Sequence, residues 1–113
     1  MAVIQDLSLI LKAKLFRGFA DPSRLAILEA LRSGEKGVSE LASIAGLTQP
    51  NASAHLSCLR ECGLVQSRQE GRFVYYSLAD ARIEDVLQGA EGILASVAEA
   101  IYDCTHYGGK EDG

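Results

Sequence analysis

The stretch that decides the fold is SELASIAGLTQPNASAHLSCLRECGLV, residues 39–65. A short helix is predicted around residues 39–45, and Gly46 ends it. Thr48 then caps a second helix, which tolerates proline in its first turn and runs to Cys62. Two helices joined by a glycine-containing turn are typical of a helix-turn-helix, so the centre of this chain predicts that motif.

A β-hairpin is predicted directly after this motif. Residues 64–65 and 73–76 are strand-like, because they are rich in β-branched and aromatic side chains. Glu70 and Gly71 between them have the chemistry of a tight turn. A hairpin that follows a helix-turn-helix is the wing of a winged helix.

Further helices are predicted on both sides of the motif. Apolar residues recur at intervals of three and four over residues 4–19, and Asp21 followed by proline begins a second helix that runs to residues 33–34. Asp80 begins a long last helix, whose apolar positions form a near-heptad seam. The predicted fold is therefore mainly α with a β-hairpin wing, in the order α-α-α-α-β-β-α.

One domain is expected over residues 1–107, followed by a disordered tail at residues 108–113. The apolar faces of the first and last helices predict a homodimer that pairs through them. The alternative is that the same apolar stripe packs on its own domain.

Composition excludes several classes of protein. The chain has 113 residues, of which 48% are hydrophobic and 23% charged, which excludes disorder as the main state. No apolar run approaches the roughly 20 residues that span a bilayer, and no secretory signal is recognised, so a cytoplasmic protein without a membrane partner is expected. The net charge of −4 taken alone opposes nucleic-acid binding, but residues 78–113 hold eight acidic and only two basic residues. The rest of the chain can therefore still meet a polyanion.

One face of the predicted second helix of the motif is polar. At about 100° per residue, Leu56 and Leu59 lie beside Ala52 on the core side, whereas glutamine, serine and arginine side chains share another face. Such a face can enter a major groove, with arginines of the wing on the phosphates; the alternative is an ordinary solvated face. The predicted DNA-binding residues are Thr48, Gln49, Ser53, Ser57, Arg60, Arg68 and Arg72.

Three cysteines are the candidate metal ligands. Cys58 and Cys62 are one helical turn apart, which brings their side chains within about 6 Å, so two thiolates can share one soft ion. Cys104, at the end of the last helix, would complete a trigonal sulfur site. The alternatives are small buried hydrophobic residues or redox thiols. His55 and His106 are candidates for a supporting role beside the ligands, and the alternative for His55 is a structural histidine.

Several segments resemble the ArsR/SmtB family of winged-helix repressors. They are residues 20–28 (ADPSRLAIL), 38–42 (VSELA), 46–48 (GLT), 53–56 (SAHL), 63–65 (GLV) and 70–76 (EGRFVYY). Within that family, residues 55–65 (HLSCLRECGLV) are very similar to the cadmium- and lead-sensing type. The resemblance implies metal binding by two recognition-helix cysteines and one in the C-terminal region of the partner subunit. These positions correspond to Cys58, Cys62 and Cys104.

Two departures from other members of the family narrow the expectation. Sensors with a Cys-Val-Cys motif carry it before the turn, where this chain has Glu40, Leu41 and Ala42. The family's zinc sensors carry carboxylate and histidine ligands along the last helix, whereas this chain has no histidine there before His106. A zinc-type interface site is therefore not expected.

The expected function is a metal-responsive transcriptional repressor and not an enzyme. The metal-free dimer is expected to bind double-stranded operator DNA and to release it when Cd(II) or Pb(II) binds the three thiolates, with no organic cofactor. Two alternatives keep the repressor: a response to As(III) or Sb(III) through the same cysteines, or a redox or persulfide switch at Cys58. A third is a role without DNA, either as a thiol enzyme or as an interaction module. No nucleophile–base pair or phosphate loop in the sequence supports catalysis.

Overall fold

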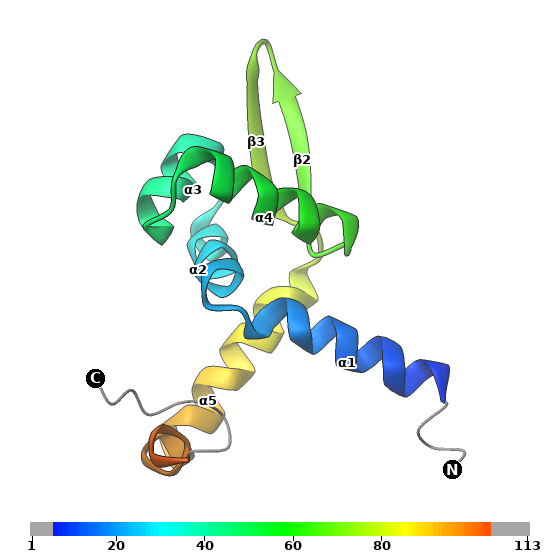
Figure 1. Ribbon diagram of the computed structural model, residues 1–113, viewed down its shortest axis with the longest axis vertical. Coiled ribbons are helices and arrows are strands. Elements are labelled where there is room, and N and C mark those ends of the chain that lie inside the picture. The colour runs from blue at the N-terminus through cyan, green and yellow to red at the C-terminus, as the bar shows by residue number, and fades with distance from the viewer. Residues whose placement is uncertain (1–5, 105–113) are drawn as a thin grey trace. The chain divides into compact units, whose positions relative to one another are not determined.

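The computed structural model describes residues 6–104, and its elements follow the predicted order (Figure 1). Residues up to Ala81 form one compact unit and residues from Arg82 onwards form a second. The elements are α1 (Leu7–Ala20), α2 (Pro22–Ala30), a 3-10 turn (Leu31–Ser33), β1 (Lys36–Gly37), α3 (Val38–Ala45), α4 (Gln49–Glu61), β2 (Val65–Glu70), β3 (Phe73–Leu78) and α5 (Ala81–Asp103). The prediction of a winged helix-turn-helix is confirmed. Residues 4–5 of the predicted first helix, the predicted tail at residues 108–113 and His106 lie outside the described residues.

Side-chain caps explain where three of the helices begin. The carboxylate of Asp6 accepts a hydrogen bond from the backbone N of Ser8, and that of Asp21 accepts one from the backbone N of Arg24. Thr48 caps α4 in the same way, with its hydroxyl oxygen 3.2 Å from the backbone N of Asn51. Such caps satisfy N–H groups that have no partner within the helix, so they define its first residue.

The turn between α3 and α4 depends on Gly46. Its φ of 69° and ψ of 36° lie in the left-handed region, which glycine adopts without the steric penalty that a Cβ brings. The backbone N of the next residue, Leu47, returns to the carbonyl oxygen of Ala42 at 2.9 Å. This bond closes the end of α3 and directs the chain into α4.

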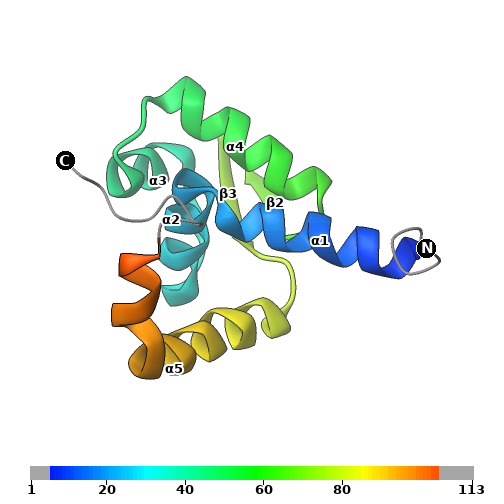
Figure 2. The same cartoon turned by 60° about the horizontal axis from the view of Figure 1, so that its bottom comes forward.

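The core of the first unit lies between α2, α3, α4 and the base of the hairpin (Figure 2). On α4, Ala52, Leu56 and Leu59 are buried, as the sequence predicted for this face. No residue of α1 is buried. The largest fully buried side chains of the described chain are Ile27, Leu28, Leu41, Leu56 and Leu59.

The wing is a hairpin of β2 and β3, and the two strands pair antiparallel from Val65–Leu78 to Glu70–Phe73. In Figure 1 the hairpin extends beyond α4. The sequence did not predict β1, which pairs with β3 at Lys36–Tyr76 and Gly37–Tyr75 and gives the sheet order β1-β3-β2. A strand of two residues is too short to show the alternation that identifies strands in a sequence.

The second unit contains α5, a helix of 23 residues. Ile83 and Leu87 near its start are buried, whereas several large apolar side chains further along are exposed, among them Ile93, Leu94, Val97 and Ile101. None of the described helices is both long and apolar enough to cross a membrane.

Candidate nucleic-acid interface and cysteine site

The polar face of α4 is exposed as the sequence predicted. Its members Gln49, Ser53, Ser57 and Arg60 are exposed, and the buried residues of α4 lie on a different face. Two of these side chains already have partners in the protein. The amide nitrogen of Gln49 donates to the hydroxyl of Ser39 at 2.9 Å, and Arg60 donates to the hydroxyl of Ser67 at 3.4 Å. Both long side chains therefore have a hydrogen-bond partner within the protein before any ligand arrives.

A cleft of about 460 Å³ separates the beginnings of α3 and α4 from the wing. Phe73, on the wing side, is 59% exposed, an unusual position for a large aromatic side chain. Sequence reasoning missed Ser39 and Phe73 as members of this surface, although Phe73 stands next to the predicted Arg72. The cleft is lined by Gly37, Val38, Ser39, Glu40, Gln49, Arg72, Phe73, Val74 and Tyr75.

The two wing arginines differ in their surroundings. Arg68 donates through Nε to Glu35 at 2.9 Å and through Nη1 to Glu70 at 2.8 Å, and its guanidinium lies 5.0 Å from the centre of the Tyr75 ring. These bonds raise the pKa of Arg68 and lower the pKa of the Glu35 carboxyl. The guanidinium of Arg72 lies 5.9 Å from the ring centre of Phe73. The two carboxylates of Glu35 and Glu70 therefore compensate the charge of Arg68, whereas Arg72 lies beside an uncharged ring.

This difference predicts unequal contributions to DNA binding. Arg72→Ala should reduce the slope of log affinity against log salt concentration by about 0.9, the value for one lost phosphate contact. Arg68→Ala should reduce it by less than about half as much, because Glu35 and Glu70 already compete with phosphate for its guanidinium. Fluorescence anisotropy at several salt concentrations measures both slopes. Equal slopes for the two variants would contradict the view that Glu35 and Glu70 already compensate the charge of Arg68.

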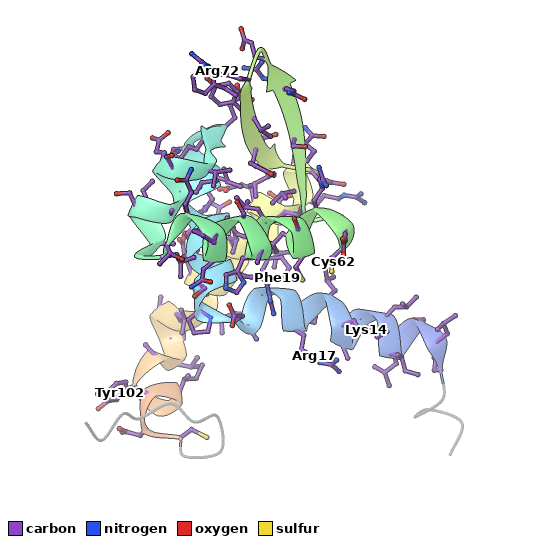
Figure 3. All side chains as sticks on the ribbon, turned by 45° about the horizontal axis from the view of Figure 1, so that its top comes forward. Lys14, Arg17, Phe19, Cys62, Arg72 and Tyr102 are labelled. Carbon is purple, nitrogen blue, oxygen red and sulfur yellow. The ribbon has the colours of Figure 1, made fainter. Side chains whose placement is uncertain are left out.

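Cys58 and Cys62 lie on the side of α4 that is nearer α1. Cys58 is half-buried, and Cys62, in the C-cap position, is exposed. Figure 3 shows Cys62 at the end of α4 near α1, from which Lys14 and Arg17 extend. Both cysteines line a cleft of about 230 Å³, whose other lining residues are Lys14, Arg17, Gly18, Arg24, Leu59 and Leu64.

Gly18 allows α1 to approach this region closely. A Cβ at this position would come within 3.0 Å of the Leu64 side chain, which is tighter than ordinary packing allows. This approach places Lys14 and Arg17 of α1 in the same cleft as the two cysteines. The spacing of the cysteines in the sequence does not predict these basic neighbours.

The two thiols lie one helical turn apart and line the same cleft. Although Cys62 is exposed, loss of part of its hydration to neighbouring atoms raises the pKa of its thiol, and the charge and hydrogen bonding of Cys58 raise it further. The positive charge of Arg24 opposes this rise. Since a soft metal ion binds thiolates, and two neighbouring thiols can share it, the pair fits a soft cation better than a hard one.

The first unit alone does not supply Cys58 and Cys62 with a third metal ligand. Among residues 6–104, no group of three or more cysteine, histidine or acidic side chains could hold a metal ion. Cys104 is half-buried and belongs to the second unit. His55 is half-buried in the first unit, and its charge contributes to lowering the pKa of Asp21, after the larger effect of the Arg24 backbone N–H.

Comparisons with known proteins agree with this architecture. The family model described as "Bacterial regulatory protein, arsR family" matches residues 21–67. The chain is 40% identical over 98 residues to a probable mercury resistance operon repressor of Streptomyces lividans, covering 87% of this chain and 78% of that protein. It is 51% identical over 75 residues to the HTH-type transcriptional regulator CmtR of Mycobacterium tuberculosis, covering 66% of this chain and 64% of that protein.

Solved structures give the same result. The NMR structure of the cadmium metal-sensor CmtR from M. tuberculosis matches with a TM-score of 0.61 and 48% identity, covering 76% of this chain and 85% of that one. A homodimeric winged helix-turn-helix DNA-binding domain from Mycobacterium bovis matches with a TM-score of 0.76 and 29% identity, covering 85% and 89%. These relatives are transcription regulators and not enzymes, which confirms the class of protein that the sequence predicted. This chain belongs to the ArsR family of bacterial regulatory proteins, which are DNA-binding transcription regulators.

Proposed function

We propose that this protein is a metal-responsive transcriptional repressor. Its metal-free dimer binds operator DNA through α4 and the wing, and it releases the DNA when a soft metal ion binds the thiolates of Cys58, Cys62 and Cys104. The observation that carries the proposal is that two thiols, one turn apart and lining one cleft, lie on the same helix that presents the polar, exposed face.

The position of the thiols on α4 supports a coupling between metal and DNA. Gln49, Ser53 and Ser57 occupy a different face of α4 from the two cysteines. One helix can therefore contact both DNA and a metal ion. Drawing the C-terminal turn of α4 towards a metal ion changes the orientation of the helix relative to the wing. A coupling free energy of about 1–3 kcal/mol weakens DNA binding roughly 5- to 150-fold, and DNA weakens metal binding by the same factor.

Cd(II) and Pb(II) are the proposed inducers. Their support is the 51% identity to CmtR, a cadmium metal-sensor of known structure. In this proposal Cys104 supplies the third sulfur. As(III) and Sb(III) also suit three thiolates, and they remain alternatives that the same titration ranks.

Hg(II) is a second candidate inducer, favoured by a specific observation. The relative from S. lividans is described as a probable repressor of a mercury resistance operon, and its match extends over 87% of this chain. Hg(II) is satisfied by two thiolates, and Cys58 and Cys62 supply two without any contribution from Cys104.

A direct test uses DNA that the protein itself selects. Duplexes are enriched from random sequence with the metal-free, reduced protein, and the best is labelled for fluorescence anisotropy. Addition of Cd(II) or Pb(II) should weaken binding at least about fivefold and produce a thiolate-to-metal absorption band. Release by Hg(II) alone would favour the second candidate. Release by peroxide or polysulfide, with no response to any metal, would replace the proposal with a thiol redox switch.

We also propose that the protein acts as a homodimer through α1 and α5. Large apolar side chains of α1 are exposed, including Phe16 at 56%, and such an apolar surface favours association. Phe16→Glu should therefore shift the dimer towards monomer in sedimentation velocity and weaken DNA binding, since a dimer holds two half-sites. Ser33→Glu, which adds the same charge at an exposed position outside α1, is the matched control. An unchanged dimer in the Phe16→Glu variant would exclude this face.

A further inference from the structure

We propose that Arg24 is a positioning residue of the metal site that compensates the negative charge of the metal–thiolate complex. It would thereby favour Cd(II) and Pb(II) held by three thiolates over Hg(II) held by two. The inference deepens the proposed function and rests on it. Nothing in the sequence singles out this arginine, which lies 34 positions before Cys58.

The first observation is an unsatisfied donor. Nε of Arg24 is buried and has no hydrogen-bond partner, and it is the one such side-chain atom among the residues that the structure describes. A buried donor without a partner costs free energy, so its persistence calls for an explanation. Sulfur of a metal-bound thiolate is an acceptor for such a donor, and hydrogen bonds to coordinating sulfur tune a metal site.

The second observation is the placement of Arg24. It lines the same cleft of about 230 Å³ as Cys58 and Cys62. Its backbone is held at the start of α2, where its N–H donates to the Asp21 carboxylate at 3.0 Å. The side chain therefore starts from a fixed point in the packed first unit and reaches the cleft beside the thiols.

Two other basic residues line this cleft but differ in exposure. Lys14 and Arg17 are exposed, whereas Arg24 is half-buried. Solvent and salt screen exposed charges strongly and half-buried charges less. Arg24 should therefore contribute more to a charged complex than either neighbour, and Arg17 provides a matched arginine for comparison.

The charge of the bound complex determines which metal benefits. Each thiol releases its proton to solvent when it binds, so three thiolates around a divalent ion carry a net charge of −1. Two thiolates around Hg(II) carry no net charge. A nearby positive charge stabilises the first complex and leaves the second nearly unaffected.

The test compares Arg24→Gln, Arg24→Lys and Arg17→Gln with the wild type, using competition titrations with Cd(II), Pb(II) and Hg(II). Arg24→Gln should lower the affinity for Cd(II) and Pb(II) by about tenfold and that for Hg(II) by less than about twofold. It should also shift the thiolate-to-cadmium absorption band. Arg24→Lys should restore most of the affinity, because it keeps the charge, and Arg17→Gln should change little.

A measurement on the unmodified protein avoids dependence on the folding of a variant. In ¹⁵N-resolved NMR, the Arg24 Nε–H resonance should shift when one equivalent of Cd(II) binds and its exchange with solvent should slow, because a hydrogen bond to sulfur forms. The inference would be overturned by an Arg24 Nε–H resonance that does not shift. It would also be overturned if Arg24→Gln lowered the affinity for all three metals equally, or if Arg17→Gln lowered the affinity for Cd(II) and Pb(II) as much as Arg24→Gln does. Failure of wild-type protein to bind any of these metals would instead overturn the proposed function.

Discussion

Replacement of Cys62 by serine should abolish metal-induced release of operator DNA while leaving the affinity of the metal-free protein nearly unchanged. The factor by which Cd(II) weakens DNA binding should fall from at least about fivefold to one. The reason is that serine keeps the size of the side chain but removes a soft sulfur ligand. Because Cys62 is exposed and follows the last residue of α4, the substitution should cost little folding free energy.

The measurement is the anisotropy titration with and without metal, together with the thiolate-to-metal absorption band. Cys58→Ser should give the same loss of response, with a somewhat larger effect on stability because Cys58 is half-buried. Cys104→Ser separates the two candidate inducers: loss of the response to Cd(II) with a retained response to Hg(II) supports a third ligand at Cys104. Full release of DNA by Cd(II) from the Cys62→Ser protein would contradict the proposed site.

Replacement of Ser53 by glutamate should weaken binding of the metal-free protein to DNA by on the order of 100-fold at about 0.1 M salt. Ser53 is exposed on the polar face of α4, about 100° around the helix from the buried Ala52. This is the face that would enter a groove of the DNA. A carboxylate there faces phosphate groups and replaces a small hydroxyl donor. Metal binding should persist, because the cysteines lie on another face of the helix.

A control variant adds the same charge elsewhere. Ser33 is exposed in the 3-10 turn after α2, and its hydroxyl accepts a hydrogen bond from Lys36 Nζ at 2.7 Å. Ser33→Glu keeps an acceptor for this lysine and should change DNA affinity by less than about threefold. Comparable losses in both variants would mean that net charge, and not the face of α4, determines the affinity.

Local patterns in the sequence predicted most of the fold. Gly46 and Thr48 mark the end of one helix and the start of the next, and both positions act as expected in the structure. The period of the α-helix was enough to separate Leu56 and Leu59 from the exposed Ser53. These features depend on residues fewer than about five positions apart, so a single sequence contains the information needed.

Interactions across longer distances could not be predicted in the same way. Arg68 pairs with Glu35, which is 33 positions away, and the pair changes the interpretation of a predicted DNA contact. The short strand β1 is defined by its pairing with β3, which lies far along the chain. Neither feature leaves a periodic trace in the sequence, because each arises from packing that brings distant segments together.

The sequence by itself determined the helix-turn-helix, the wing, the polar face of α4 and the adjacent pair Cys58 and Cys62, because helical spacing and turn chemistry are local properties. Only the tertiary structure decided which charges are already compensated and which surround the thiols. It paired Arg68 with carboxylates, and it placed Arg24 beside the cysteines with a buried, unpartnered Nε. Burial and the distance between charged groups depend on how the helices pack, and together they determine the energy with which two charges in a protein interact.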